Sequence, residues 1–276
     1  MQPTFSEIKA AAKSSLKHRW PEAIAVSLVL MATSLLSTVI QQVLMSVFRI
    51  NVTWSLFTTE GIPAYSVAAG IGIIAFSVIL SLAVIVPLAF GVMRWFWLVT
   101  GGSDPTVGEI FHYFSSAKVF FKTLGLSVSL YWRIIVGTIV CFAPYIAVRV
   151  LTSPELYNRL GVTMPLVMDS LNSLASIFRV LGLIAVLLWM SIYLFCYAVV
   201  FTEPQLSVRG SIKRSIAVSK GFRFSSVCFL FSFFGWWLAG ILVLPLLFTV
   251  PYVFASFAVY GREVYRSNNR TAKAEV

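Results

Sequence analysis

Residues 66–97 read SVAAGIGIIAFSVILSLAVIVPLAFGVMRWFW, and their first charged residue is Arg94. A helix of about 20 apolar residues is long enough to cross the hydrocarbon core of a membrane, which is about 30 Å thick. Inside lipid, the peptide groups of such a segment are satisfied only within a helix or a closed barrel. The stretch therefore predicts a transmembrane helix and, with it, a membrane-embedded fold.

The composition of the whole chain supports this prediction. Of 276 residues, 59% are hydrophobic and 11% are charged, whereas soluble domains are roughly 45–50% apolar and about 25% charged. We predict a single all-α, polytopic helix bundle over residues 1–276 with a polar tail at 266–276. Its six spans are predicted at residues 22–48, 66–97, 124–150, 180–201, 224–243 and 246–260. The last is short for a crossing, so a membrane-surface helix or a re-entrant segment is the alternative there.

The basic residues predict the topology. The net charge is +11, and such a charge could indicate nucleic-acid binding. Here, however, the cations flank the predicted spans, as the positive-inside rule expects, and no nucleic-acid partner is predicted. With six spans, sixteen Lys and Arg residues share the side of the two termini, whereas Arg49, Arg149, Arg159 and Arg179 lie opposite. Five spans would give twelve against eight, so we predict a bacterial inner-membrane protein with both termini cytoplasmic.

Three segments that precede predicted spans are amphipathic. The first two open with Thr4-Phe5-Ser6-Glu7 and Thr106-Val107-Gly108-Glu109, which are capping-box patterns, and the third follows Glu203-Pro204. We predict interfacial helices whose cations contact anionic lipid head groups. The predicted contacts are Lys9, Lys13, Lys17, Arg209, Lys213, Arg214 and Lys220. Glu22 and Glu203 are predicted to be solvated edge charges, or else partners of Arg19, Arg209 or Arg223.

The spacing of these segments suggests an internal repeat. Ile8, Ile110 and Ile212 are separated by 102 residues each time (110 − 8 and 212 − 110). The repeat units would be residues 4–98, 106–201 and 204–265, each an interfacial helix followed by a membrane hairpin. Chance similarity in so apolar a chain is the alternative.

One cation lies deep inside a predicted span. Arg133 follows Tyr131 and Trp132, deep in the third span, where an arginine costs about 2.5–3.5 kcal/mol on insertion. We predict that these three residues contact an anionic ligand in a cavity. The alternative is an arginine that snorkels to the interface or bonds to backbone carbonyls.

Patterns typical of enzymes are missing from the sequence. The two histidines, His18 and His112, stand in predicted interfacial segments without metal-binding or nucleophile motifs around them. Cys141, Cys196 and Cys228 fall inside apolar spans and suggest no disulfide framework. We therefore predict no catalytic residues, no metal and no cofactor.

Several segments resemble a bacterial family of integral membrane proteins, domain of unknown function 975. They are the basic N-terminal segment ending at Trp20, Pro87-Leu88-Ala89-Phe90-Gly91, Glu203-Pro204-Gln205-Leu206-Ser207, Ser211-Ile212-Lys213-Arg214-Ser215, Lys220-Gly221, Phe231-Ser232-Phe233-Phe234-Gly235-Trp236 and Pro251-Tyr252. The resemblance implies a multi-spanning membrane fold. It implies no activity and no catalytic or ligand positions.

Two functional hypotheses follow. The first is a non-enzymatic membrane protein that binds or transports an amphipathic or anionic small molecule or lipid, with Arg133 at its cavity. The second is a structural or accessory subunit whose basic cytoplasmic helices organise anionic lipid or hold an unidentified partner protein.

Overall fold

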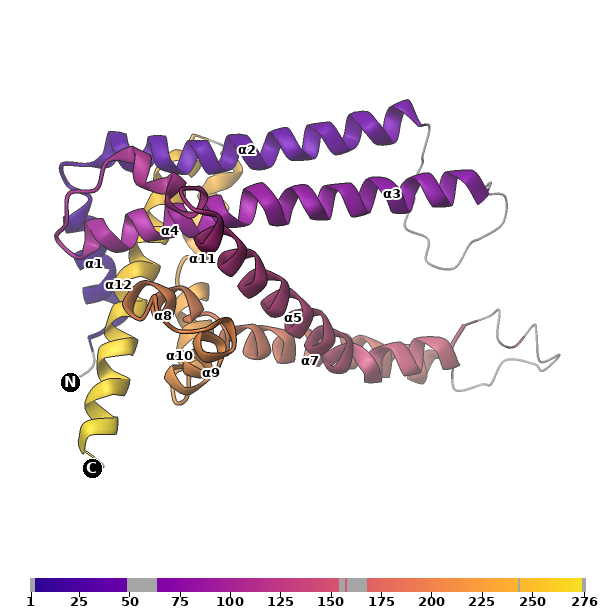
Figure 1. The fold of residues 1–276 in the computed structure, drawn as a ribbon. Coiled ribbons are helices and arrows are strands. Elements are labelled where there is room, and N and C mark those ends of the chain that lie inside the picture. Colours follow the sequence, from indigo (N-terminus) through magenta and orange to yellow (C-terminus); the bar gives the residue numbers. More distant parts are fainter. Residues whose placement is uncertain (1–2, 49–63, 154–156, 158–167, 243, 275–276) are drawn as a thin grey trace. The chain divides into compact units, whose positions relative to one another are not determined.

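A computed structural model describes residues 3–48, 64–153, 157, 168–242 and 244–274. All regular secondary structure in these residues is helical (Figure 1). The chain forms two compact units. Unit 1 comprises Met1–Ser127 and Phe234–Ser267, and unit 2 comprises Val128–Phe233 and Asn268–Val276. The predicted outer cations Arg49 and Arg159 lie outside the described residues.

Five helical stretches are long and apolar enough to cross a membrane. They are Trp20–Val47, Ala69–Thr100, Ala117–Leu151, Asp169–Thr202 and Arg223–Leu242. Many of their large apolar side chains, such as Leu35, Ile79 and Ile139, are exposed on the protein surface, as lipid-facing residues are. The chain is therefore an all-helical, multi-pass membrane protein. The predicted sixth span, residues 246–260, is not among these stretches and is not confirmed.

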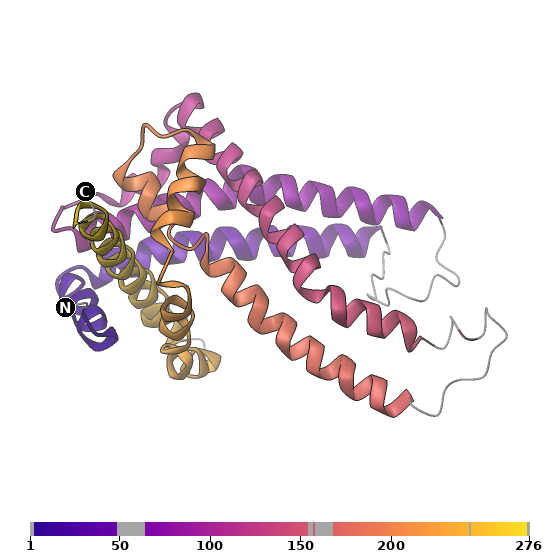
Figure 2. The same ribbon diagram turned by 90° about the horizontal axis from the view of Figure 1, so that it is seen from below.

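Unit 1 begins with α1 (Phe5–Ser15) and α2 (Trp20–Val47). The stretch quoted above forms α3 (Ala64–Leu80), one π-helical segment η1 (Ser81–Ile85) and α4 (Val86–Thr100), and α3 runs beside α2 (Figures 1 and 2). The amide of Val86 bonds to the carbonyl of Ser81, a wider turn than that of an α-helix. It directly precedes Pro87, which has no amide hydrogen to donate.

The remainder of unit 1 packs around α4. A 3₁₀ helix, η2 (Val107–Phe114), lies against α4, and the start of α5 (Ala117–Leu151) follows. After unit 2, the chain returns with α11 (Phe234–Ala239), η3 (Gly240–Leu242) and α12 (Leu246–Ala274). Trp95 and Phe96 are fully buried, and the Phe96 ring stacks on Phe254 with centroids 5.5 Å apart.

Unit 2 contains the rest of α5 with α7 (Met168–Ser191), α8 (Cys196–Thr202), α9 (Val208–Val218) and α10 (Arg223–Phe231). The indole Nε1 of Trp189 on α7 donates a hydrogen bond to the carbonyl of Arg133 on α5, at 3.1 Å. α8 packs on α9, and α10 packs on α7. Buried Ser215 of α9 donates to the Ile192 carbonyl at 3.4 Å.

The three amphipathic segments differ in how they begin. At α1 the capping box is confirmed, because the Thr4 hydroxyl accepts from the Glu7 amide (3.3 Å) and the Glu7 carboxylate accepts from the Thr4 amide (2.7 Å). At η2 the box predicted at Thr106 does not form. The Glu109 amide bonds instead to the Thr106 carbonyl at 3.1 Å, as a 3₁₀ turn requires.

The third segment begins later than predicted. Ser207 caps α9 by accepting from the Gly210 amide at 3.2 Å, and Pro204 lies in the preceding turn. A serine in extended conformation satisfies an orphan amide, which a proline side chain cannot do. Because one segment is a 3₁₀ helix and two are α-helices, the predicted three-fold repeat is not confirmed.

The apolar faces of these segments contact protein. Ile8, Ala12 and Leu16 are buried, as are Ile110 and Ile212. The predicted placement of these segments at the membrane interface is therefore not confirmed. Most of the predicted polar tail belongs to a helix, because α12 continues to Ala274. No proline or glycine follows Gly261 to end that helix.

Candidate functional site

A pocket of about 620 Å³ lies in unit 1 beside the start of α2. It is lined by Lys13 of α1, Trp20 of α2, Trp236 of α11, Leu244 and Pro245 of the following turn, and Phe248 and Tyr252 of α12. Ligand pockets in proteins typically enclose about 300–1,000 Å³, so this volume admits a ligand.

Local sequence orients two of the lining residues, Lys13 and Trp20. Ala12 and Leu16 are buried, which turns the intervening Lys13 toward the exposed side of α1. Pro21, whose φ suits the first helical turn, follows Trp20 at the start of α2. The Trp20 ring then packs against Phe248, with centroids 5.8 Å apart.

The opposite wall is held by a second aromatic pair. Trp236 contacts Tyr252 with ring centroids 5.5 Å apart. Between these residues the chain turns at η3 and Pro245, where Gly240 gives room to Leu246: a Cβ at Gly240 would lie 2.6 Å from a methyl carbon of Leu246. The pocket therefore depends on small and ring-shaped residues from two distant parts of the chain.

The chemistry of the lining is strongly asymmetric. Its walls are aromatic, aliphatic and proline side chains, and Lys13 is the one charged residue among those that line it. An apolar chamber bordered by one ammonium group suits a molecule with a hydrocarbon part and a negative group. Trp and Tyr at its border are typical of residues at the membrane interface.

A second pocket of about 610 Å³ lies between α1 and α12. Its acidic lining residues already have partners within the protein. The Glu7 carboxylate accepts from the Thr4 amide, and Glu263 pairs with Arg266 at 3.1 Å. These contacts make it a weaker candidate than the pocket of Lys13.

Two ion pairs in unit 1 connect α4 and the loop after it to neighbouring segments. Arg19 pairs with Asp104, and Arg94 Nε lies 3.5 Å from Glu109 Oε2. The partner of Arg19 in the structure is thus Asp104, whereas the sequence offered Glu22. Asp104 follows the end of α4 and is close to Arg19 only once α2 and α4 have packed together.

Tyr113 and His112 complete the cluster around Arg94. Burial raises the pKa of Tyr113 to about 12, although the nearby Arg94 opposes this shift. Burial also lowers the pKa of His112 from its ordinary value of 6.5, and Arg94 lowers it further, whereas Glu109 raises it. The His112 imidazole is therefore held in its neutral form to lower pH than in an unfolded chain.

We expect His112 to make the protein less stable in acid. Between its lowered pKa and about 6.5, the unfolded chain binds more protons than the folded chain, so the free energy of unfolding falls as the pH falls through this window. His112→Gln should reduce that loss when thermal unfolding is compared at about pH 7 and about pH 5.

His18→Gln is measured in parallel, because His18 is the other histidine of the chain and is exposed in the turn before α2. If His112→Gln loses as much stability in acid as the unsubstituted protein, His112 does not contribute to the pH dependence.

The predicted head-group cations lie in different surroundings. Lys13 of α1 and Lys17 of the following turn are exposed, and Lys9 of α1 is half-buried. Around α9, Arg209, Lys213 and Lys220 are exposed, but Arg214 is half-buried.

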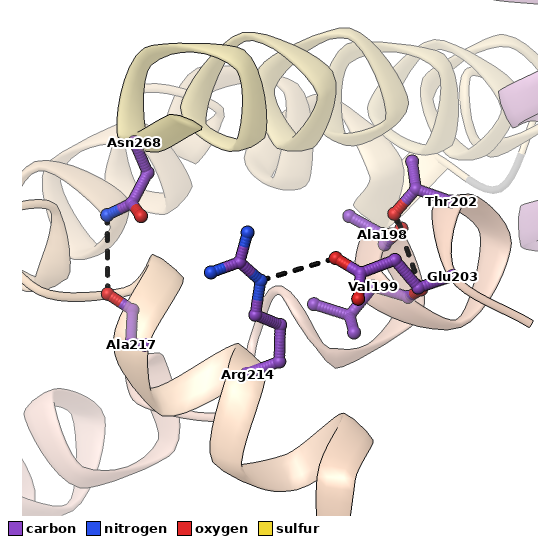
Figure 3. A network of polar contacts seen from close by, with 7 residues as sticks. All are labelled: Ala198, Val199, Thr202, Glu203, Arg214, Ala217 and Asn268. Atoms are coloured by element: carbon purple, nitrogen blue, oxygen red, sulfur yellow. Dashed lines mark hydrogen bonds and ion pairs between the residues drawn. The ribbon is translucent and has the colours of Figure 1, made fainter. Parts of the chain in front are cut away.

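Arg214 takes part in a polar network within unit 2 (Figure 3). Its Nε donates to Glu203 Oε1 at 3.2 Å, and the Asn268 side-chain amide donates to the Ala217 carbonyl at 3.3 Å. Glu203 thus pairs with Arg214, and not with Arg209 or Arg223 as the sequence suggested. The charge of Arg214 is already balanced within the protein.

The pocket predicted around Arg133 is not one of the two described above. Arg133 is half-buried, and its Nε has no hydrogen-bond partner among the described residues. Tyr131 and Trp132 are exposed. These three residues remain predicted ligand contacts.

Sequence reasoning missed most of the pocket of Lys13. The sequence analysis assigned no ligand-binding role to Trp236, Phe248 and Tyr252, although Lys13 was predicted to contact lipid. The available signal was the break at Gly240 and Pro245 between two aromatic blocks, which indicates a turn that brings those blocks together.

A comparison with protein families gives one match. A family model described as "Protein of unknown function (DUF975)" matches residues 1–268, which include every residue of the pocket of Lys13. No curated protein and no solved structure matches the chain. The chain therefore belongs to the DUF975 family, as the resemblance in its sequence implied.

Proposed function

We propose that this protein is a non-enzymatic membrane protein that binds an amphipathic anion, most simply an anionic lipid, in the pocket of Lys13. One observation carries the proposal: a chamber of about 620 Å³ with apolar walls has a single charged lining residue, which is cationic. The acyl chains would occupy the walls formed by Trp236, Phe248 and Tyr252, and the phosphate would pair with the Lys13 ammonium.

The location proposed for the protein is a bacterial inner membrane, with both termini cytoplasmic. Contacts within unit 1 support a common side for the two ends. The Phe5 ring of α1 meets Tyr260 of α12 edge-on at 6.4 Å, and the Arg262 guanidinium lies 4.5 Å from the ring centre of Trp97 at the end of α4. The excess of cations near both ends supports a cytoplasmic location for this side, as the positive-inside rule expects.

The same placement makes anionic lipid the expected ligand. The cytoplasmic leaflet carries the negative surface potential that attracts basic segments, by about 1 kcal/mol for each Lys or Arg near the surface. Half-buried Lys9 lies on the same helix as Lys13, and exposed Lys17 lies in the turn that follows that helix. They would raise the local concentration of anionic lipid at the mouth of the pocket.

Lys13→Gln should lower the affinity for anionic lipid by about ten- to a hundredfold, because a hydrogen bond to a charged group contributes about 1.5–3 kcal/mol. Native mass spectrometry of the gently purified protein measures this loss. Phosphatidylglycerol is the anionic probe, and phosphatidylethanolamine is the zwitterionic comparison.

Lys17→Gln provides a control of equal charge change in the turn just after α1, since Lys17 does not line the pocket. It should retain phosphatidylglycerol. Arg133→Ala tests the alternative site in unit 2. If phosphatidylglycerol is retained by Lys13→Gln and lost by Arg133→Ala, the pocket of Lys13 is not the binding site.

A further inference from the structure

One end of unit 1 is defined by its cations and aromatic residues. α2 begins at Trp20, directly after Lys17 and Arg19, and crosses away from this end. α3 and α4 return to it, because Arg19 pairs with Asp104 just after α4 ends at Thr100. We call this end, which holds Lys13, Trp20 and Asp104, the N-terminal face of unit 1.

α12 lies along the N-terminal face. Its Phe248 packs on Trp20 and its Arg262 lies over Trp97 and donates to the Trp97 carbonyl. A helix rises 1.5 Å per residue, so these two α12 residues are about 21 Å apart along its axis. Both nevertheless contact residues at the same end of α2 and α4, which a helix parallel to α2 and α4 could not achieve. Figure 1 shows α12 running across the ends of these helices.

The turn before α12 lies at this face as well. Leu244 and Pro245 line the same pocket as Lys13 and Trp20. If Arg223–Leu242 crossed the membrane from the cytoplasm, this turn would emerge on the opposite side, a full membrane thickness from Lys13. Because Leu244 and Pro245 line the same pocket as Lys13, the turn cannot lie on the opposite side of the membrane from Lys13.

The side chains of the turn are apolar and exposed. Ile241 is 76% exposed, Leu242 74% and Leu244 73%. Apolar residues grouped in this way indicate contact with a membrane, and Trp20 and Lys13 beside them are residue types of the interface between water and lipid. Acyl chains are therefore the partner that fits this surface.

We propose that residues 234–260 do not cross the membrane. α11 and η3 dip into the leaflet on the side of the two termini, Ile241, Leu242 and Leu244 lie among its acyl chains, and α12 returns along its interface. Of the five candidate spans, Arg223–Leu242 then does not cross the membrane, because its part in unit 1, Phe234–Leu242, is re-entrant. Both termini then share one side with four crossings, and the pocket of Lys13 opens toward that leaflet.

Cysteine labelling in sealed membrane vesicles tests this topology. The full chain, with Cys141, Cys196 and Cys228 replaced by serine, receives Leu244→Cys or Ile241→Cys, and Lys17→Cys serves as the aqueous reference on the same face. A membrane-impermeant maleimide is added from either side. In parallel, an environment-sensitive fluorophore on the cysteine is exposed to lipids with nitroxide on their acyl chains.

We expect Lys17→Cys to react with the maleimide from the side of the termini. The cysteines at 241 and 244 should not react from the opposite side. A fluorophore attached to either of them should be quenched by the acyl-chain nitroxide. Reaction from the opposite side would show a crossing and overturn the proposal. If the cysteines at 241 and 244 react from the side of the termini and their fluorophores are not quenched, these residues do not insert into the leaflet. Lys13 is intact in all these variants, so failure here is separate from failure of lipid binding.

A reporter fused after residue 276 supplies an independent measurement. It should lie on the same side as a reporter at the N-terminus. If the two reporters lie on opposite sides of the membrane, the number of crossings is odd. That result would overturn the proposal even if the labelled cysteines proved inaccessible.

Discussion

Gly91→Ala is expected to lower the free energy of unfolding by about 1–3 kcal/mol or more, because no side chain fits where α4 meets η2. A Cβ at position 91 would lie 1.8 Å from the carbonyl oxygen of Ile110 and 2.6 Å from its carbonyl carbon. These are backbone atoms, which cannot rotate away as a side chain can. η2 would have to move as a whole, and with it the contact between Arg94 and Glu109.

Thermal unfolding of the purified protein in detergent measures this effect. Gly72→Ala is the control, because Gly72 is also helical and a Cβ there meets no atom within 4 Å. It should leave the unfolding temperature close to that of the unsubstituted protein, since alanine favours a helix over glycine. Equal unfolding temperatures for the two variants would contradict the close approach of η2 to α4.

Gly137→Ala should have the second-largest effect, in unit 2. Its Cβ would lie 1.9 Å from Nε1 and 2.2 Å from Cε2 of Trp189, so the indole rests directly on Gly137. The ring would be displaced, and its hydrogen bond to the Arg133 carbonyl would be lost. Overpacking costs about 1–3 kcal/mol and a hydrogen bond about 1 kcal/mol, which together give the expected destabilisation.

A double-mutant cycle isolates this contact. Trp189→Ala removes the ring, so adding Gly137→Ala to that variant should change the unfolding temperature little. If the two substitutions are additive instead, the clash with Trp189 is not the cause of the loss. The comparison also separates ring packing from the general effect of alanine in a helix.

Local sequence predicted the features that depend on local physics. The spans at residues 22–48, 66–97 and 124–150 were predicted, because a peptide backbone in lipid must bond to itself over a length fixed by the membrane. The capping box at Thr4 was also predicted, since its partners are three residues apart.

Predictions that needed distant partners were less successful. The same Thr-x-x-Glu pattern at Thr106 gives no capping box, and the Glu109 carboxylate pairs with Arg94 on α4. A partner on another helix competes with the local amide, and a pattern of four residues carries no information about that helix. The ion pair of Arg19 with Asp104 escaped prediction for the same reason.

The sequence by itself therefore determined that this chain is a helical, multi-pass membrane protein of the DUF975 family, because length, hydropathy and motif are properties of consecutive residues. Only the tertiary structure decided that Lys13 and Trp20 share a pocket with Trp236 and Phe248, more than 200 residues later in the chain. Apolar helices offer many equivalent packing faces, and which faces meet depends on the fit of particular side chains, such as Trp189 on Gly137.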